Sequence, residues 1–254
     1  MNTTAFEPCR ILYQDADLIA VNKLAGELVV ADRWGKEPHV LLHALGDYLR
    51  SIGHGKDASG RDLYPVHRLD RDTSGVVLFA KHRAAHKLLS GMFEGREVEK
   101  TYWAFTSGCP PWEQHQVDAP LSRREGKRGR GRGFVDLVNG KPAQTAFRLV
   151  RCFGDIAWLE AKPLTGRLHQ IRLHAQLAGF PLLNDPHYGK TDWKTALIGI
   201  SPLARFPLHA RTVEFNHPTT RAPVRIEAPL DAALSVFIHE LAAATGTSLP
   251  NFPL

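Results

Sequence analysis

The sequence predicts a single α+β domain in which a few helices flank one mixed β-sheet. At about 150 residues per domain, the 254 residues correspond to one large domain or two small ones. No internal repeat or linker divides the chain. Hydrophobic residues make up 43% and charged residues 23%, which is typical of a globular protein. Several short segments with strand character alternate irregularly with segments of helical periodicity.

The first half of the chain is predicted to hold four strands and two helices. Ile11–Tyr13 and Leu18–Val21 have strand character on either side of a turn at 15–17. Val76–Ala80 is apolar on both faces, which predicts a central strand that is buried on both sides. Pro38–Ile52 is predicted to be helical because its apolar residues recur at helix spacing. The other predicted elements of this half are a helix over 83–93 and a strand over 98–106.

The second half is predicted to hold four more strands and two more helices. Leu168–Leu177 is a predicted helix that ends near Gly179, because glycine favours a helix C-terminus. Asp231 is the predicted N-cap of a last helix that extends to Ala244. The predicted strands lie at 143–150, 156–162, 208–215 and 224–228.

Targeting and cysteine patterns indicate the compartment. No apolar run reaches the length of a membrane span, and Met1–Pro8 lacks the basic start and apolar core of a signal peptide. Cys9, Cys109 and Cys152 are odd in number and have no CxxC spacing, so reduced thiols are expected rather than a disulfide framework. The sequence therefore predicts a soluble cytoplasmic protein.

Positive charge concentrates in one Gly/Arg-rich segment, Arg123–Arg132, which holds six basic residues and one acidic residue. Without this segment the net charge falls from +6 to +1. A Gly/Arg run has no apolar face, which predicts a mobile loop at about 122–133. Because arginine makes salt-sensitive contacts to nucleic-acid phosphates, the loop is a candidate phosphate-binding arm, with a merely solvated loop as the alternative. The candidate contact residues are Arg124, Arg128, Arg130 and Arg132.

Familiar nucleotide, hydrolase and metal signatures are missing from the sequence. There is no phosphate-binding loop and no GxSxG segment, and the GxG at 129–131 follows an arginine run rather than a strand. The pairs His39/His43 and His82/His86 have the i,i+4 spacing that can share a metal ion. Neither pair has an HExxH context or a nearby cysteine, so ordinary surface or packing histidines are predicted, and no metal site.

Two polar segments do not fit ordinary structure. Tyr64–Gly75 crowds five charged or titratable side chains into a turn directly before the predicted buried strand. Such a cluster is costly to desolvate unless its members are paired, and pairing changes carboxylate chemistry. The alternative is a salt-bridged turn that Thr73 and Ser74 cap.

The second polar segment is Thr165–His174. A helix here places Arg172 at the edge of the buried face, beside Leu168 and Ala175. A half-buried arginine needs a carboxylate partner, and Asp70 in the first segment is the candidate. An aspartate that an arginine holds ionised is suited to act as a nucleophile.

Both segments resemble motifs of the RluA-type RNA pseudouridine synthases. The residues from His67 to Gly75 (HRLDRDTSG) are similar to the family signature, and those from Gly166 to Arg172 (GRLHQIR) to its third motif. Glu99–Tyr102 (EKTY) resembles the family's tyrosine motif. The resemblance extends through almost the whole chain. It implies the pseudouridine synthase fold, with a mixed, mostly antiparallel central sheet flanked by helices in one catalytic domain over 1–254.

The resemblance also implies roles for individual residues. Asp70 matches the catalytic aspartate that attacks the target uridine, and Arg172 matches the arginine that pairs with it. Tyr102 matches the tyrosine that packs on the target base and is proposed as a proton-transfer base, with an ordinary core tyrosine as the alternative. Arg68 is expected to contact RNA backbone or to fill the space left by the flipped base, and Leu208 to form a wall of the pocket.

The implied reaction determines which catalytic groups the protein needs. The N1–C1′ bond of uridine breaks, the base rotates, and C5 bonds to C1′. This requires a nucleophile, a proton acceptor and a dry pocket, and no redox cofactor, ATP or metal is expected. Attack of Asp70 at C1′, attack at C6 and formation of a glycal are all compatible with the sequence.

The expected partner is structured RNA, namely loops of ribosomal or transfer RNA, whose bases are already partly unpaired. Ribosomal RNA is preferred. Because the motifs start by Ile11, the chain is expected to lack the separate N-terminal RNA-binding module of many family members. A monomer without an obligate protein partner or membrane contact is expected. The alternatives are an inactive RNA-binding protein of the same fold, disfavoured by the presence of all three catalytic matches, and a nucleoside hydrolase, which would release free uracil.

Overall fold

The computed structural model describes residues 6–31, 40–54, 60, 63–124, 131–189, 200 and 203–250. The chain forms two compact units within the predicted α+β fold. Unit 1 consists of Met1–Glu99 and Ala210–Ala228, and unit 2 of Lys100–His209 and Pro229–Leu254. The chain passes between the units within strands β5 (Glu99–Ser107) and β11 (Leu208–Asn216) and again after Ala228.

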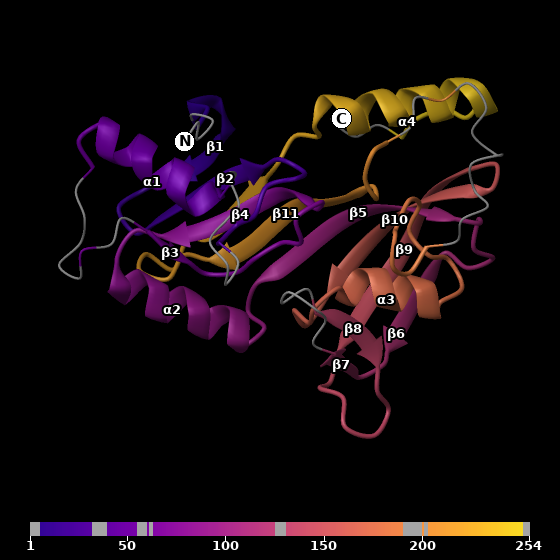
Figure 1. Cartoon of the computed structure of the whole chain (residues 1–254), viewed down its shortest axis with the longest axis horizontal. Coiled ribbons are helices and arrows are strands. Elements are labelled where there is room, and N and C mark those ends of the chain that lie inside the picture. The colour runs from indigo at the N-terminus through magenta and orange to yellow at the C-terminus, as the bar shows by residue number, and fades with distance from the viewer. Residues whose placement is uncertain are drawn as a thin grey trace. The chain divides into compact units, whose positions relative to one another are not determined.

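Unit 1 is built on a sheet with the strand order β1-β2-β4-β11, to which β3 adds beside β4 and β12 beside β11. The pairs with a described register, such as β2 with β4 and β11 with β12, are antiparallel. Figure 1 shows helices α1 and α2 on opposite faces of this sheet. The elements are a short 3-10 helix at Pro8–Arg10, β1 (Ile11–Gln14), β2 (Leu18–Lys23), α1 (Leu41–Ser51), β3 (Tyr64–Pro65), β4 (Ser74–Ala80), α2 (Arg83–Glu94) and β12 (Pro223–Glu227).

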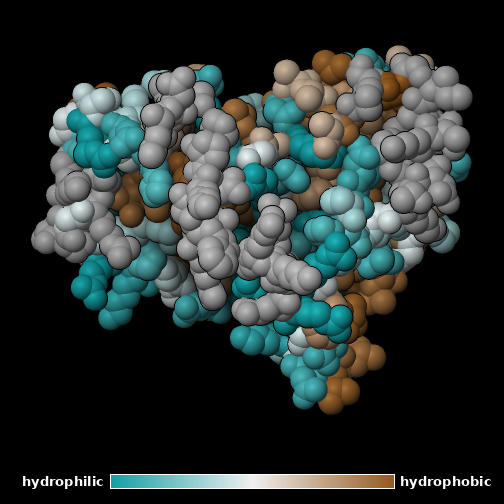
Figure 2. Space-filling view, in the orientation of Figure 1, coloured by the Kyte–Doolittle hydropathy of each residue, from teal (hydrophilic) through white to brown (hydrophobic). Residues whose placement is uncertain are grey.

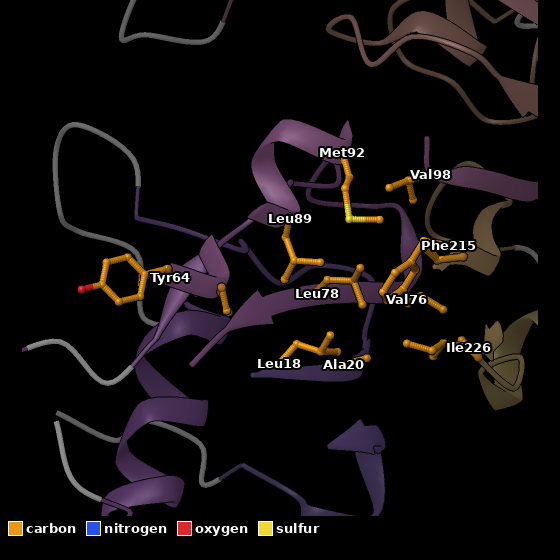
Figure 3. Packing of buried hydrophobic residues seen from close by; sticks show 14 residues of the cluster. Leu18, Ala20, Tyr64, Val76, Leu78, Leu89, Met92, Val98, Phe215 and Ile226 are labelled. Atoms are coloured by element: carbon orange, nitrogen blue, oxygen red, sulfur yellow. The ribbon is translucent and has the colours of Figure 1, made fainter. Parts of the chain in front are cut away.

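The central strand β4 is buried at all seven of its residues, as the sequence predicts. One face of β4 packs in a core cluster with α2, and Figure 3 shows Leu89 and Met92 of that helix pointing toward Leu78. Val77 and Phe79 project to the other face by the alternation of a strand, and both are fully buried. Covering a strand on both faces requires a continuous apolar run, which explains why this element is readable from the sequence alone.

Unit 2 is a second layered structure in which a sheet of order β5-β10-β9-β6 lies between α3 and α4 (Figure 1). Residues of α3 pack with Ala104, Ala157 and Leu159 on one face, and those of α4 pack with Phe105 and Trp158 on the other. No described helix has the length and apolar character needed to cross a membrane. The further elements are β6 (Gln114–Asp118), β7 (Leu121–Arg124), β8 (Arg132–Val135), β9 (Gln144–Phe153), β10 (Ile156–Pro163), α3 (Gln170–Leu177) and α4 (Ala232–Thr245).

Most predicted elements are confirmed within a few residues. Asp231 caps α4 as predicted, because its carboxylate accepts a hydrogen bond from the amide of Leu234. The first helix begins only at Leu41, and its predicted start at 38–39 lies outside the described residues. Strand β6 was not predicted, because it is an edge strand with four exposed residues out of five and has no apolar alternation.

The prediction of reduced thiols is wrong for two of the three cysteines. Cys109 and Cys152 form a disulfide with a Cα–Cα distance of 5.7 Å, whereas Cys9 is free and exposed. The two cysteines lie 43 residues apart, but β5 and β9 both flank β10, which brings their ends together. Sequence spacing could not reveal this pairing, and the cysteine count therefore gives no argument about the compartment.

Candidate active site

Asp70 lies in the turn that precedes β4 in unit 1. The backbone amide of Thr73 donates to the carbonyl of Asp70 at 3.2 Å, which closes the turn. Leu69 and Thr73 are buried on either side of the half-buried Asp70. These two buried neighbours anchor the turn in the core, whereas Asp70 itself stays partly exposed.

The buried side chain of Lys23 also holds the Asp70 turn in place. Lys23 at the end of β2 is fully buried, and its ammonium donates to the carbonyls of Leu24, Arg71 and Thr73 at 2.8, 2.7 and 2.7 Å. The amide of Gly26 adds a bond to the carbonyl of Arg71 at 2.9 Å. Burial of a cation is tolerated only when polar atoms surround it, so these carbonyls and Lys23 fix one another. The sequence analysis does not predict this contact between Lys23 and the Asp70 turn.

The backbone conformation and close packing at position 75, the last residue of the HRLDRDTSG segment, require glycine. The φ of Gly75 is +111°, and a Cβ at this position would lie 2.2 Å from the carbonyl oxygen of Ala210 on β11. Only glycine permits both the backbone conformation and the close approach of β4 to β11. Arg68 lies three residues after the end of β3 and is exposed, and its predicted RNA contact stays a prediction.

Arg172 lies on α3 of unit 2 and is buried, more deeply than the predicted half-buried position at the edge of the helix face. Its Nε and Nη2 donate to the two carboxylate oxygens of Asp185 at 2.6 and 2.8 Å. Asp185 also accepts from the amides of His187 and Tyr188, at 2.9 and 3.2 Å. Asp185 lies in the loop after α3 and was not among the predicted site residues. The predicted pairing of Arg172 with Asp70 stays a prediction.

Two aromatic rings and the aspartate together hold the guanidinium of Arg172. Its Cζ lies 5.1 Å from the ring centre of Tyr188 and 4.3 Å from that of Phe206, within range of cation–π attraction. Burial alone would raise the pKa of Asp185, but the hydrogen bonds and charge of Arg172 outweigh it and lower that pKa. The pair is therefore ionised at neutral pH, with the guanidinium in one fixed orientation.

A buried hydrogen-bond chain fixes α3 itself. The side-chain amide of Gln170 donates to the hydroxyl of Thr145 at 3.0 Å and accepts from the hydroxyl of Thr165 at 2.6 Å. The imidazole of His174 lies 2.9 Å from the same Thr145 hydroxyl and 3.1 Å from the carbonyl of Ala119. Desolvation lowers the pKa of His174, so this histidine is neutral and structural. The polar residues around Arg172 thus orient the helix that carries it.

The structure brings Tyr102 and Leu208 into one cluster on the α3 face of the unit 2 sheet. Leu208 and Phe206 are buried members of that cluster, and the half-buried Tyr102 packs against it. Ala104, two residues after Tyr102 on β5, belongs to the same cluster. Three of the sequence-predicted residues, Tyr102, Arg172 and Leu208, therefore belong to one region of unit 2, while Asp70 and Arg68 belong to unit 1.

The basic segment is partly a hairpin rather than a loop. The predicted loop over 122–133 is too long, because β7 and β8 pair antiparallel and place Arg124 opposite Arg132. Arg128 and Arg130 lie outside the described residues. Figure 2 shows hydrophilic residues over this hairpin. The guanidinium of Arg124 lies over the ring of Phe134, 5.3 Å from its centre.

A cluster in unit 1 has the composition of a metal site but a different function. One ligand atom each from Asp15, Asp17 and His217 lies within 4.8 Å of the others. Nδ1 of His217 accepts from the amides of Thr219 and Thr220, so its proton is on Nε2 and is donated to Asp15 at 2.8 Å. A metal on Nε2 would require a proton on Nδ1, facing those two amides. The residues therefore do not fit a metal ion and instead tie the β1–β2 turn to the β11–β12 turn.

Both ring nitrogens of His82 are likewise engaged in contacts within the protein, which leaves neither for a metal ion. Its Nδ1 accepts from the amide of Ala85 as the N-cap of α2, and its Nε2 lies 2.9 Å from Asp17. The ring of His86 packs on that of Tyr64 at 5.3 Å. These contacts agree with the prediction of ordinary packing histidines at 82 and 86.

The acidic pair in this cluster predicts a loss of stability in acid. Burial would raise the pKa of Asp15, but hydrogen bonds from Leu18, Tyr13 and Asp17 lower it, and Thr219 followed by His82 lowers that of Asp17. Groups with a lowered folded-state pKa stabilise the fold above their unfolded value of about 3.9, and this contribution is lost as the pH falls below it. We expect Asp15→Asn to be less stable by about 1 kcal/mol at pH 7 and to lose less stability between pH 5 and 3. Urea unfolding across this range measures both effects, and equal pH slopes for the two proteins would contradict the prediction.

Comparison with known proteins defines the class of fold and then the family. The structure resembles that of human RNA Pseudouridylate Synthase Domain Containing 4, with a TM-score of 0.69 over 91% of this chain and 92% of that chain at 24% identity, which shows a pseudouridine synthase fold. A model of the RNA pseudouridylate synthase family matches residues 17–177. The "Ribosomal large subunit pseudouridine synthase C" of Vibrio cholerae is 36% identical over 92% of this chain and 70% of its own length. The protein of the same name in Escherichia coli is 35% identical over 91% and 69%.

The chain therefore belongs to the RNA pseudouridylate synthase family, of the RluA type, and is an isomerase that acts on RNA. The predicted fold class, family and activity are confirmed.

Proposed function

We propose that this enzyme converts specific uridines in stem–loops of large-subunit ribosomal RNA to pseudouridine, with Asp70 as the nucleophile. The observation that carries the proposal is the turn of Asp70, which buried Lys23 holds in one conformation through its contacts with the carbonyls of Arg71 and Thr73. A nucleophile benefits from such a fixed position because its attack then requires no further ordering. The names of the relatives from V. cholerae and E. coli support large-subunit ribosomal RNA as the substrate.

The other site residues complete the proposed reaction. Arg172 carries a fixed positive charge. We assign to this charge the stabilisation of the ionised carboxylate of Asp70. Tyr102 stacks on the target base and accepts a proton, while Leu208 excludes water from one side of the base. Arg68 contacts the RNA from its exposed position after β3. The enzyme acts as a cytoplasmic monomer in this proposal.

Mapping of pseudouridines tests the substrate. Ribosomal and transfer RNA from cells that lack the protein should lose pseudouridine at specific loop positions of large-subunit ribosomal RNA, and the purified enzyme should restore them. Loss confined to transfer RNA would overturn the choice of substrate. The release of free uracil by the purified enzyme would identify a hydrolase instead, and complete retention of all pseudouridines would contradict the proposal.

The basic hairpin is expected to supply salt-sensitive affinity. Replacing Arg124, Arg128 and Arg130 with serine should weaken binding to many RNAs, because these residues contact phosphates rather than particular bases. The slope of log affinity against log salt should fall by up to about 0.7–0.9 for each lost contact. Fluorescence anisotropy over a series of salt concentrations measures the slope. An unchanged slope would show that the hairpin is only a solvated segment.

Arg132 is kept out of that set of substitutions because of its place in the structure. Its Nη2 donates to Nδ1 of His187 at 2.8 Å, two residues from Asp185. A Cβ at the neighbouring Gly133 would lie 2.7 Å from Leu173 and 2.8 Å from the carbonyl of Leu168, so β8 packs closely against α3. The hairpin is distant from the site motifs in sequence, but its second strand adjoins the helix of Arg172.

A further inference from the structure

Three polar residues beside Arg172 have no role in the proposed reaction. They are His169 at the N-cap of α3, His187 in the loop after Asp185, and Arg132 on β8. His187 and Arg132 are exposed, and His169 is half-buried. We call this group the His–Arg patch.

His187 is held as a neutral imidazole. A guanidinium can only donate, so the bond from Arg132 to Nδ1 of His187 leaves the ring proton on Nε2. Desolvation, followed by the positive charges of Arg132 and Arg172, lowers the pKa of His187. Its backbone amide is fixed by the bond to Asp185 at 2.9 Å. His187 thus presents an oriented aromatic ring and one donor, and it is not a cation for phosphate.

His169 adds a strained backbone to the patch. Its φ of 55° is in the left-handed region, where residues other than glycine are uncommon. Such strain persists when the surroundings fix it, and it gathers at binding and catalytic sites. The ring of His169 lies within 25° of parallel to that of His187, with centres 6.2 Å apart. Its Nδ1 lies 2.9 Å from the hydroxyl of Tyr188.

Tyr188 connects the patch to the hairpin and to Arg172. Its hydroxyl donates to the carbonyl of Gly133 at 3.0 Å and accepts from the Gly133 amide at 3.1 Å. The same ring faces the guanidinium of Arg172. The two imidazoles are therefore oriented before any ligand arrives, next to a residue of the candidate active site.

We propose that the His–Arg patch is a subsite for one unpaired nucleobase of the RNA, adjacent to the target uridine. The base stacks on the imidazole of His187, and the phosphate of that nucleotide binds Arg132. Aromatic faces beside arginines bind single-stranded nucleotides in this way, because every base offers a π-face. Arg132 has five N–H donors, and the contact with His187 uses one of them. The inference rests on the proposed RNA substrate.

The test measures binding of a fluorescein-labelled stem–loop RNA that carries the mapped uridine, in an Asp70→Asn background that prevents turnover. His187→Ala should weaken binding about 10- to 100-fold, the range expected for one stacked base. His187→Phe should restore affinity to within about threefold, because phenylalanine keeps the stacking face. The salt slope should not change for His187→Ala but should fall by about 0.7–0.9 for Arg132→Gln.

Abasic RNAs identify the nucleotide. Removal of one base next to the target should weaken binding to the protein with His187 but have no further effect on His187→Ala. His239→Ala is the matched control, since this exposed histidine lies on α4, and its affinity should be unchanged. Binding of His187→Ala within twofold of the parent, or an equal abasic penalty in both proteins, would overturn the subsite. If the protein with Asp70 intact binds this RNA tightly but leaves its uridine unmodified, the proposed function is overturned instead, and the binding comparison still decides the subsite.

Discussion

Asp70→Asn is expected to fold, to bind RNA and to form no pseudouridine. Asparagine has nearly the same shape, and the Thr73 amide still finds the Asp70 backbone carbonyl that closes the turn. The amide lacks the negative charge and nucleophilicity of a carboxylate, so the covalent step cannot begin. Single-turnover pseudouridine formation on the mapped stem–loop measures the rate, and anisotropy measures the affinity.

Asp72 provides the matched control for this prediction. Asp72 lies in the same turn and is half-buried like Asp70. Its replacement by asparagine also removes one negative charge. Asp72→Asn should keep a rate close to that of the wild type. A rate for Asp70→Asn within tenfold of the wild type would rule out Asp70 as the nucleophile.

Arg172→Met is expected to reduce both activity and stability. Activity should fall more than RNA affinity, because the ionised nucleophile loses its proposed counter-charge. The structure adds a second effect, since the substitution leaves the buried carboxylate of Asp185 without the arginine that occupies both of its oxygens. Breaking a buried ion pair from one side costs about 3–5 kcal/mol of unfolding free energy. Urea unfolding at pH 7 measures this loss.

The double variant Arg172→Met/Asp185→Asn separates the two effects. Removing the orphaned charge should recover much of the stability, whereas the activity should stay low. The pH dependence gives an independent check. In the wild type the lowered pKa of Asp185 means that its contribution is lost only in strong acid. In Arg172→Met the lone buried carboxylate takes up a proton more readily, so the deficit should shrink as the pH falls from 7 toward 5. A single variant as stable as the wild type at pH 7 would contradict this account, as would weak RNA binding with unchanged turnover.

The strength of local signals explains which elements could be predicted. Val76–Ala80 is a continuous apolar run and is buried on both sides of its sheet, as predicted. Asp231 was predicted as an N-cap from residue type alone, because capping depends on atoms only three residues away. The strands of the basic hairpin were missed, since their Arg-rich sequence has no alternation and their pairing depends on contact between β8 and α3.

The features of the candidate site likewise fall into those that the sequence predicts and those that only the tertiary structure shows. The sequence by itself determined the family and the turn that carries Asp70, because each depends on a contiguous motif, whereas it placed Arg172 only at the edge of the buried face. Only the tertiary structure decided the partners of these residues: Asp185 for Arg172, and the buried Lys23 for the turn. It also decided the pairing of Cys109 with Cys152. A local pattern specifies which face of an element is buried, but the group that meets a buried charge depends on how distant segments of the chain fold together.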